Sequence, residues 1–157
     1  MKIPLDIRKK QKENGEKHIY CELTGIPNCR KPHFFGHNIT FMVDTGATME
    51  CTLTESDADL LGISLSGSGV NELPDEDCPN AWSGTLKTYT IKKVELLMRG
   101  IEEGKEKLFH GNIDVCYIST DIDKGIPSVI GTRFLVKNNL RLMFSPNEDE
   151  AYLEVIE

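Results

Sequence analysis

The sequence lacks a disulfide framework. Its five cysteines, at positions 21, 29, 51, 78 and 116, are odd in number and scattered over 157 residues, so they cannot all pair within one chain. Scattered cysteines of this kind are typical of reduced thiols in a reducing compartment. We therefore expect a cytoplasmic protein whose fold rests on its core and not on cross-links.

Long apolar runs are also absent. No segment approaches the roughly 18 to 20 consecutive apolar residues that a membrane-spanning helix requires. Residues 1–17 are charged where a secretory signal would carry its apolar stretch. Both absences predict a soluble protein without a membrane partner.

An excess of basic residues is missing as well. Lys and Arg number 18 against 25 Asp and Glu, which gives a formal net charge of −7 at pH 7. Proteins that bind a phosphate backbone do so largely through clustered Lys and Arg. The composition therefore argues against a nucleic-acid partner.

What the chain does contain is a succession of short β-like segments. Its length fits one domain, which we assign to residues 18–157, after a polar arm at residues 1–17 that is expected to be loose or to order on a partner. Capping signals predict a short helix at 54–63, a turn of helix is expected at 132–138, and a Gly- and Ser-rich surface excursion is expected at 64–83. Strand patterns occur at residues 18–23, 38–43, 86–91, 94–98, 112–118, 129–131, 140–144 and 152–156. We therefore predict a mostly β domain.

The most informative segment places a carboxylate at the end of an apolar strand. The apolar run covers residues 39–43, and the motif that follows reads Asp44-Thr45-Gly46-Ala47. A charge at the end of a buried strand is costly unless a function retains it. The alternative interpretation of Asp44 is a turn residue before a glycine, which is common in β proteins.

A pair of carboxyl groups can hydrolyse a peptide bond without a covalent intermediate. One carboxylate activates a water molecule, and a second, protonated carboxyl group donates to the carbonyl oxygen. The chain contains Asp-Thr-Gly once and Asp-Ser-Gly nowhere. The second carboxyl group must then come from another subunit, and a two-fold axis beside Asp44 would supply its symmetry mate. We expect a homodimer that is catalytic only as a dimer.

These residues resemble the retropepsin-like aspartic proteases, a single-lobed homodimeric family that includes retroviral proteases. The resemblance implies an all-β, closed-barrel fold with one lobe per chain and endopeptidase activity on polypeptide substrates, without metal or cofactor. It makes Asp44 the catalytic residue and Thr45 a brace between the two active-site loops. It also lets the Gly46 amide approach the carboxylates, and Ala47 fits the usual continuation.

The same resemblance assigns two further elements. An apolar-apolar-Gly element behind the active loop corresponds to Val129, Ile130 and Gly131, followed by the helix predicted at 132–138. The family closes a hairpin flap over its substrate, and the flap tip corresponds to Trp82, Ser83 and Gly84. Terminal strands of relatives form an interfacial sheet, which makes residues 152–156 a candidate interface strand.

Other functions are compatible with some of these residues. The same fold could serve as a non-catalytic dimeric module that binds peptides or acts as a scaffold, and Trp82 could be a core residue instead of a flap cover. Donor residues at positions 21, 29, 33 and 37 have the types that bind zinc, but their spacings match no standard finger. Asp121 and Asp123 follow an apolar strand as in aspartyl phosphatases, but that chemistry requires an α/β sheet with several crossover helices.

Overall fold

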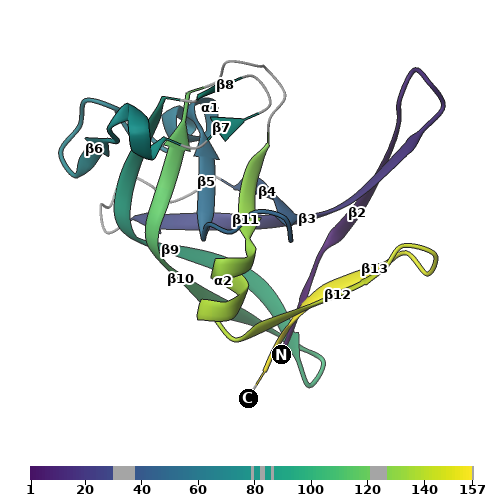
Figure 1. The fold of residues 1–157 in the computed structure, drawn as a ribbon. Coiled ribbons are helices and arrows are strands. Elements are labelled where there is room, and N and C mark those ends of the chain that lie inside the picture. Colours follow the sequence, from purple (N-terminus) through teal and green to yellow (C-terminus); the bar gives the residue numbers. More distant parts are fainter. Residues whose placement is uncertain (30–37, 79, 82–83, 86, 121–126, 157) are drawn as a thin grey trace.

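The computed structural model describes residues 1–29, 38–78, 80–81, 84–85, 87–120 and 127–156 (Figure 1). Strands dominate this part of the chain. They are β1 (Lys2–Pro4), β2 (Asp6–Gln11), β3 (Lys17–Cys29), β4 (Ile39–Asp44), β5 (Cys51–Thr54), β6 (Val70–Glu72), β7 (Asn80–Ala81), β8 (Gly84–Thr85), β9 (Thr88–Glu102), β10 (Lys105–Ser119), β11 (Ser128–Gly131), β12 (Leu140–Ser145) and β13 (Glu150–Val155). The helices are α1 (Glu55–Leu60), α2 (Thr132–Lys137) and a 3₁₀ turn at Asp75–Asp77.

Six of these strands close into a barrel. The hydrogen-bonded order is β9-β10-β5-β11-β4-β3, and β3 pairs again with β9 to complete the circle. Two of the pairings are parallel, between β11 and β4 and between β10 and β5, and the remaining pairings are antiparallel. The predicted all-β, closed-barrel fold with short helices is confirmed.

Alternating side chains fill the barrel. Successive side chains of a strand point to opposite faces, so every second residue of β4 is buried, as Phe41 and Val43 are. Ile130 of β11, Leu53 of β5 and Leu96 of β9 are also buried, and each lies at the inward position of its strand. This packed interior holds the ends of β4 and β11 in place, which is where the candidate site lies.

The two strand patterns at residues 86–91 and 94–98 belong to one long strand. β9 continues through the polar pair Lys92 and Lys93, whose side chains are both exposed. It then turns into β10 through Glu103 and Gly104, both of which have positive φ values, 50° and 74°. Two central residues with φ > 0 are typical of the tight turn that matches the twist of a β-hairpin.

The first 17 residues differ from the loose arm expected of them. β1 lies between β13 and β9, and β2 pairs along its length with β3. The reason is an apolar alternation beneath the charge: Ile3 is fully buried, Leu5 is buried and Ile7 packs against the core. The boundary between residues 17 and 18 stays a prediction.

The helix predictions at 54–63 and 132–138 are confirmed by α1 and α2. Thr54 caps α1, because its Oγ1 accepts the Asp57 N–H at 3.1 Å. Gly62 follows the helix with φ of +70°, the left-handed conformation that favours glycine at this position. Among the described residues, neither helix is long and apolar enough to cross a lipid bilayer.

Two hairpins project from the barrel on the same side, β2–β3 and β12–β13 (Figure 1). The Leu5 N–H donates to the Ala151 carbonyl at 3.0 Å, which joins the start of the β2–β3 hairpin to the outer part of β13. Farther out, the Lys9 ammonium forms an ion pair with Asp149. The two hairpins therefore form one extension of the sheet.

Candidate active site

Asp44 is the last residue of β4, and the barrel determines where its carboxylate lies. The strand runs parallel to β11, with Asp44 in register with Gly131. The Asp44 side chain is half-buried, whereas Thr45 and Gly46 are exposed in the turn that follows. The carboxylate therefore stands at the rim of the packed interior with access to solvent.

The turn after Asp44 fixes one oxygen of this carboxylate. Oδ1 of Asp44 accepts the Gly46 N–H at 2.8 Å, and the Asp44 carbonyl accepts the Ala47 N–H at 3.2 Å. Among the described residues, no ion pair engages the Asp44 carboxylate. It is thus oriented by the backbone and is not neutralised within one chain.

The element at 129–131 packs directly behind this loop. The Ala47 carbonyl accepts both the Thr132 N–H at 2.9 Å and the Thr132 hydroxyl at 3.1 Å. The Glu50 carbonyl accepts the Gly131 N–H at 3.2 Å. These bonds tie the two ends of the loop from Ala47 to Glu50 to the start of α2.

Gly131 is required by this close approach. A Cβ at this position would lie 2.3 Å from the Met49 carbonyl oxygen and 2.6 Å from that of Ala47. Both atoms belong to the backbone, which a side-chain rotation cannot move away. Val129 and Ile130 place this glycine by pairing with β4 on one side and with β5 on the other.

Glu50 ends the loop with a buried carboxylate. One oxygen accepts the Asp114 N–H of β10 at 2.7 Å, and the Lys137 ammonium lies 3.8 Å away. A buried charge needs such partners, because its desolvation is otherwise uncompensated. Glu50 thereby fastens the loop that follows Asp44 to β10, on the far side of the barrel wall from β4.

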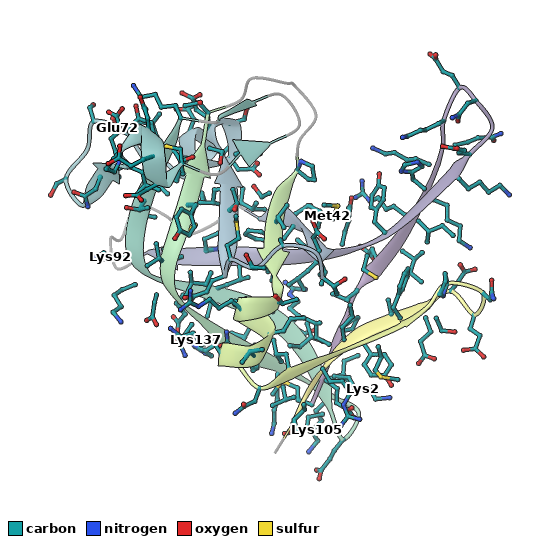
Figure 2. All side chains as sticks on the ribbon, viewed as in Figure 1. Lys2, Met42, Glu72, Lys92, Lys105 and Lys137 are labelled. Carbon is teal, nitrogen blue, oxygen red and sulfur yellow. The ribbon has the colours of Figure 1, made fainter. Side chains whose placement is uncertain are left out.

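Lys137 connects this point to a second carboxylate. It forms an ion pair with Asp114, which also pairs with Lys93 at 2.8 Å, and Figure 2 shows Lys137 at the end of α2. The neighbouring Lys137 and Lys93 ammonium groups lower the pKa of Asp114 to about 2. Asp114 is therefore ionised in mildly acidic solution.

A further brace joins α1 to β11. The buried Ser128 hydroxyl accepts the Thr54 N–H at 3.1 Å and donates to the Asp57 carboxylate. The first turn of α1 is thus fixed to the strand that carries Gly131. Sequence reasoning did not predict the roles of Ser128, Glu50, Lys137 and Thr132, because partners 64 or more residues apart leave no local pattern.

Part of the expected flap is described. β7 and β8 form a separate two-stranded antiparallel sheet, in which Ala81 pairs with Gly84. Trp82 and Ser83 lie between these strands but outside the described residues. The assignment of all three flap residues, Gly84 included, stays a prediction.

The alternative sites fall mostly outside the described chain. This holds for Asp121 and Asp123, and for both histidines at positions 33 and 37 of the zinc hypothesis. Cys21 is buried in the core, and burial raises the pKa of its thiol. Among the described residues, no group of three or more His, Cys, Asp or Glu side chains is arranged to bind a metal ion.

The geometry thus combines a single-lobed closed barrel with an Asp-Thr-Gly loop held against a glycine of a parallel strand. No family model matches the chain, and no curated sequence does. A solved structure of a retropepsin-like aspartic protease from Rickettsia conorii matches at a TM-score of 0.50 and 20% identity, covering 98% of this chain and 88% of its own. The protein therefore has the retropepsin-like aspartic protease fold.

Two other solved structures are similar at a lower level. The EIAV protease, solved with an inhibitor, has a TM-score of 0.47 and 14% identity over 78% of this chain and 91% of its own. The retroviral protease-like domain of Ddi1 from Leishmania major has a TM-score of 0.40 and 13% identity, covering 76% and 78%.

Proposed function

We propose that this protein is an aspartic endopeptidase that acts as a homodimer, with Asp44 of each chain contributing one carboxyl group to a shared centre. The main support for the proposal is the environment of the Asp44 carboxylate. Its carboxylate is held by the Gly46 amide, reaches solvent and is not consumed by an ion pair among the described residues. A purely structural aspartate at the end of a buried strand would be expected to have such a partner.

The reaction follows from two equivalent carboxyl groups around a two-fold axis. Two such groups in hydrogen-bonding distance share one proton, and aspartic proteases are the established example of this behaviour. The ionised Asp44 takes a proton from water, whose oxygen attacks the peptide carbonyl carbon. The protonated Asp44 donates its proton to the carbonyl oxygen. Collapse of the resulting diol then breaks the C–N bond as the amine is protonated.

A polypeptide in extended conformation fits this site best. The β7–β8 hairpin supplies a short strand pair of its own, and the turn at Asp44 supplies a floor. A peptide between them would gain affinity from main-chain hydrogen bonds and selectivity from side-chain pockets. We expect the substrate to be protein or peptide in the cytoplasm, without a cofactor.

The substitution Asp44→Asn tests the chemistry. The Asn side-chain oxygen can still accept the Gly46 N–H, so fold and association should be retained while the titrating group is lost. We expect cleavage of a peptide library, followed by mass spectrometry, to fall at least about 100-fold, together with loss of binding of a pepstatin-like inhibitor. Unchanged cleavage in this variant would overturn the proposed mechanism.

The matched control is Asp59→Asn on α1, which removes an equally charged but exposed carboxylate. It should cleave as the wild type does. The rival function, a non-catalytic module that binds peptides, predicts a different outcome: the wild-type protein retains labelled peptides without producing fragments, and Asp44→Asn changes nothing in the digest.

A further inference from the structure

The negative charge of this chain is concentrated in one segment. Residues 32–86 contain nine Asp and Glu residues and no Lys or Arg. The other 102 residues hold all 18 basic residues and 16 of the 25 acidic ones. The net charge of −7 therefore arises from the segment that includes β4, β5, α1, β6 and the β7–β8 pair.

The fold gathers much of this segment at one end of the molecule. α1, β6 and the β7–β8 pair lie at the end of the barrel away from the β2–β3 and β12–β13 hairpins (Figure 1). Among the residues that the structure describes, Glu55, Asp75 and Glu76 of this region form no ion pair. Charge of one sign on one part of a surface raises the local concentration of oppositely charged ligands. This end of the protein therefore suits a cationic partner.

An open cavity of about 850 Å³ lies at the same end of the molecule. Its lining includes Glu55 of α1, Ile63 and Leu65 from the turn after α1, Glu72 of β6 and Tyr89 of β9. Figure 2 shows Glu72 beside α1 and the start of β9. We call it the α1–β6 cavity. Its volume lies in the range of sites that bind ligands.

The lining of the α1–β6 cavity combines apolar side chains with carboxylates. Ile63 is part of the buried core, and Leu65 and Tyr89 pack against that core while remaining half-exposed. Lys and Arg side chains have the matching construction, an apolar stem that ends in a charged group. The apolar side chains can contact the stem while Glu55 or Glu72 pairs with the charged group. An anionic ligand would be repelled, and an inorganic cation would gain nothing from the apolar part of the lining.

One ammonium group of the chain itself is already bound by this lining. The Lys87 ammonium forms an ion pair with Glu72 at 3.1 Å and lies 5.7 Å from the centre of the Tyr89 ring. The Glu72 carboxylate, followed by the Tyr89 hydroxyl, raises the pKa of Lys87. An aromatic ring beside a carboxylate attracts a cation through both groups. Two residues of the cavity therefore bind an ammonium group in the present structure, independently of any count of charges.

We propose that the α1–β6 cavity binds a Lys- or Arg-containing segment of the polypeptide substrate, outside the catalytic centre. Its lining residues come from α1, the turn after α1, β6 and β9, and none comes from the loop that follows Asp44. That the bound polypeptide is a substrate rests on the proposed function, whereas the binding itself does not. The cavity adds affinity without touching the scissile bond, so a basic segment should lower KM and leave kcat unchanged.

Binding of a labelled hexalysine peptide tests the cavity without relying on catalysis. In the Asp44→Asn background, fluorescence anisotropy should show binding of hexalysine and none of hexaglutamate. Glu55→Gln with Glu72→Gln should weaken hexalysine binding at least about 10-fold, because both carboxylates of the cavity are lost. Glu13→Gln with Glu16→Gln removes the same charge from the exposed end of the β2–β3 hairpin and should weaken it less than about 2-fold. Equal weakening by the two double variants would mean that net charge alone attracts hexalysine, and would overturn the proposal.

Removal of the internal cation should improve binding, an effect that damage to the fold would not produce. Lys87→Met frees the Glu72 carboxylate for an external ammonium group, so hexalysine should bind at least about 3-fold more tightly. Lys105→Met is the control, because it removes the same charge from the far end of β10 and should change the affinity little. Hexalysine that binds Lys87→Met no better than Lys105→Met would contradict the site.

These results are separable from the proposed chemistry. If the Asp44→Asn protein binds hexalysine in the cavity but the wild type cleaves nothing, the docking site stands and only the proposed chemistry fails. If the wild type cleaves, and Glu55→Gln with Glu72→Gln leaves the KM ratio of a Lys-containing to a Gln-containing peptide unchanged, only the docking site fails. Calcium chloride that displaces hexalysine at micromolar concentration would assign the cavity to a metal ion and would also overturn the proposal.

Discussion

At the scale of single residues, the loop after Asp44 depends on a glycine 87 positions later. Gly131 faces the carbonyl oxygens of Ala47 and Met49, and no other residue leaves room for them. The chain brings this glycine there by pairing β11 with β4 in parallel. The constraint is thus steric, and it arises from the backbone of the same loop that holds Asp44.

Gly131→Ala should therefore destabilise the protein through overpacking. The added Cβ would lie 2.3 Å from backbone oxygen, so the loop or β11 must shift. We expect a loss of about 2–3 kcal/mol in the free energy of unfolding, measured by urea denaturation. The cleavage rate should fall by more than the loss of folded protein accounts for, because the shift reaches Asp44 directly.

Gly104→Ala is the control for this substitution. Gly104 has a φ of +74° and nothing within 4 Å of its added Cβ, so only the left-handed conformation is penalised, by about 1 kcal/mol. Its cleavage should be normal, since the β9–β10 turn does not contact the loop. If both variants lose activity equally, the steric account of Gly131 is wrong.

The positions of Asp44 and Gly131 could be predicted from the sequence, whereas the residues that support them could not. Asp44 and Gly131 stand in short motifs at the ends of apolar strands, so local pattern was sufficient. Glu50 could not be predicted in this way. Nothing in the sequence distinguishes it from the other acidic residues, because its partner Asp114 lies 64 residues away. Only the parallel pairing of β5 with β10 explains why a buried carboxylate is tolerated there.

At the scale of elements, α2 is attached to the barrel by charge. Lys137 in its last turn pairs with Asp114 of β10 and lies 3.8 Å from Glu50 at the end of the loop that follows Asp44. A cation near a helix C-terminus also interacts favourably with the helix dipole. The helix, the strand and the loop therefore share one charged contact.

The stability contribution of this contact should depend on pH. The pKa of Asp114 is lowered to about 2 in the folded protein from an ordinary value near 3.8, so its contribution is present above about pH 4 and is lost as the pH falls towards 2. We expect Lys137→Met to unfold at lower urea concentration than the wild type at pH 5. At pH 2 the two proteins should differ much less.

Lys105→Met, which removes a lysine from the other end of β10, controls for the loss of charge alone. It should lower the urea midpoint little at either pH. A deficit of Lys137→Met that is as large at pH 2 as at pH 5 would contradict the role assigned to Asp114.

Element predictions succeeded where local signals exist. Thr54 and Gly62 marked both ends of α1 correctly, because caps act through neighbouring residues. β1 and β2 were not predicted as part of the sheet, because their apolar residues alternate with the charged residues that dominate the composition of residues 1–17. The short strand β6 was hidden in a Gly- and Ser-rich segment, where its pairing with β9 alone makes it a strand.

At the scale of the whole molecule, the decisive property is that each chain encodes half of the proposed centre. Asp-Thr-Gly occurs once in the 157 residues, and Asp44 is not ion-paired among the residues the structure describes. Subunit exchange should therefore control activity. A dimer of one wild-type chain and one Asp44→Asn chain has a single titrating carboxyl group and cannot supply both base and acid.

Mixing the two chains at fixed total concentration should show this as a non-linear loss. If exchange is random, an equal mixture contains about one quarter wild-type homodimers, so cleavage should fall to about one quarter of the wild-type rate and not to one half. Mixing with Asp59→Asn is the control, because every dimer then keeps both Asp44 carboxyl groups and the rate should stay at the wild-type value. A linear fall with Asp44→Asn alone would mean that each chain acts by itself, and the two-chain mechanism would have to be abandoned.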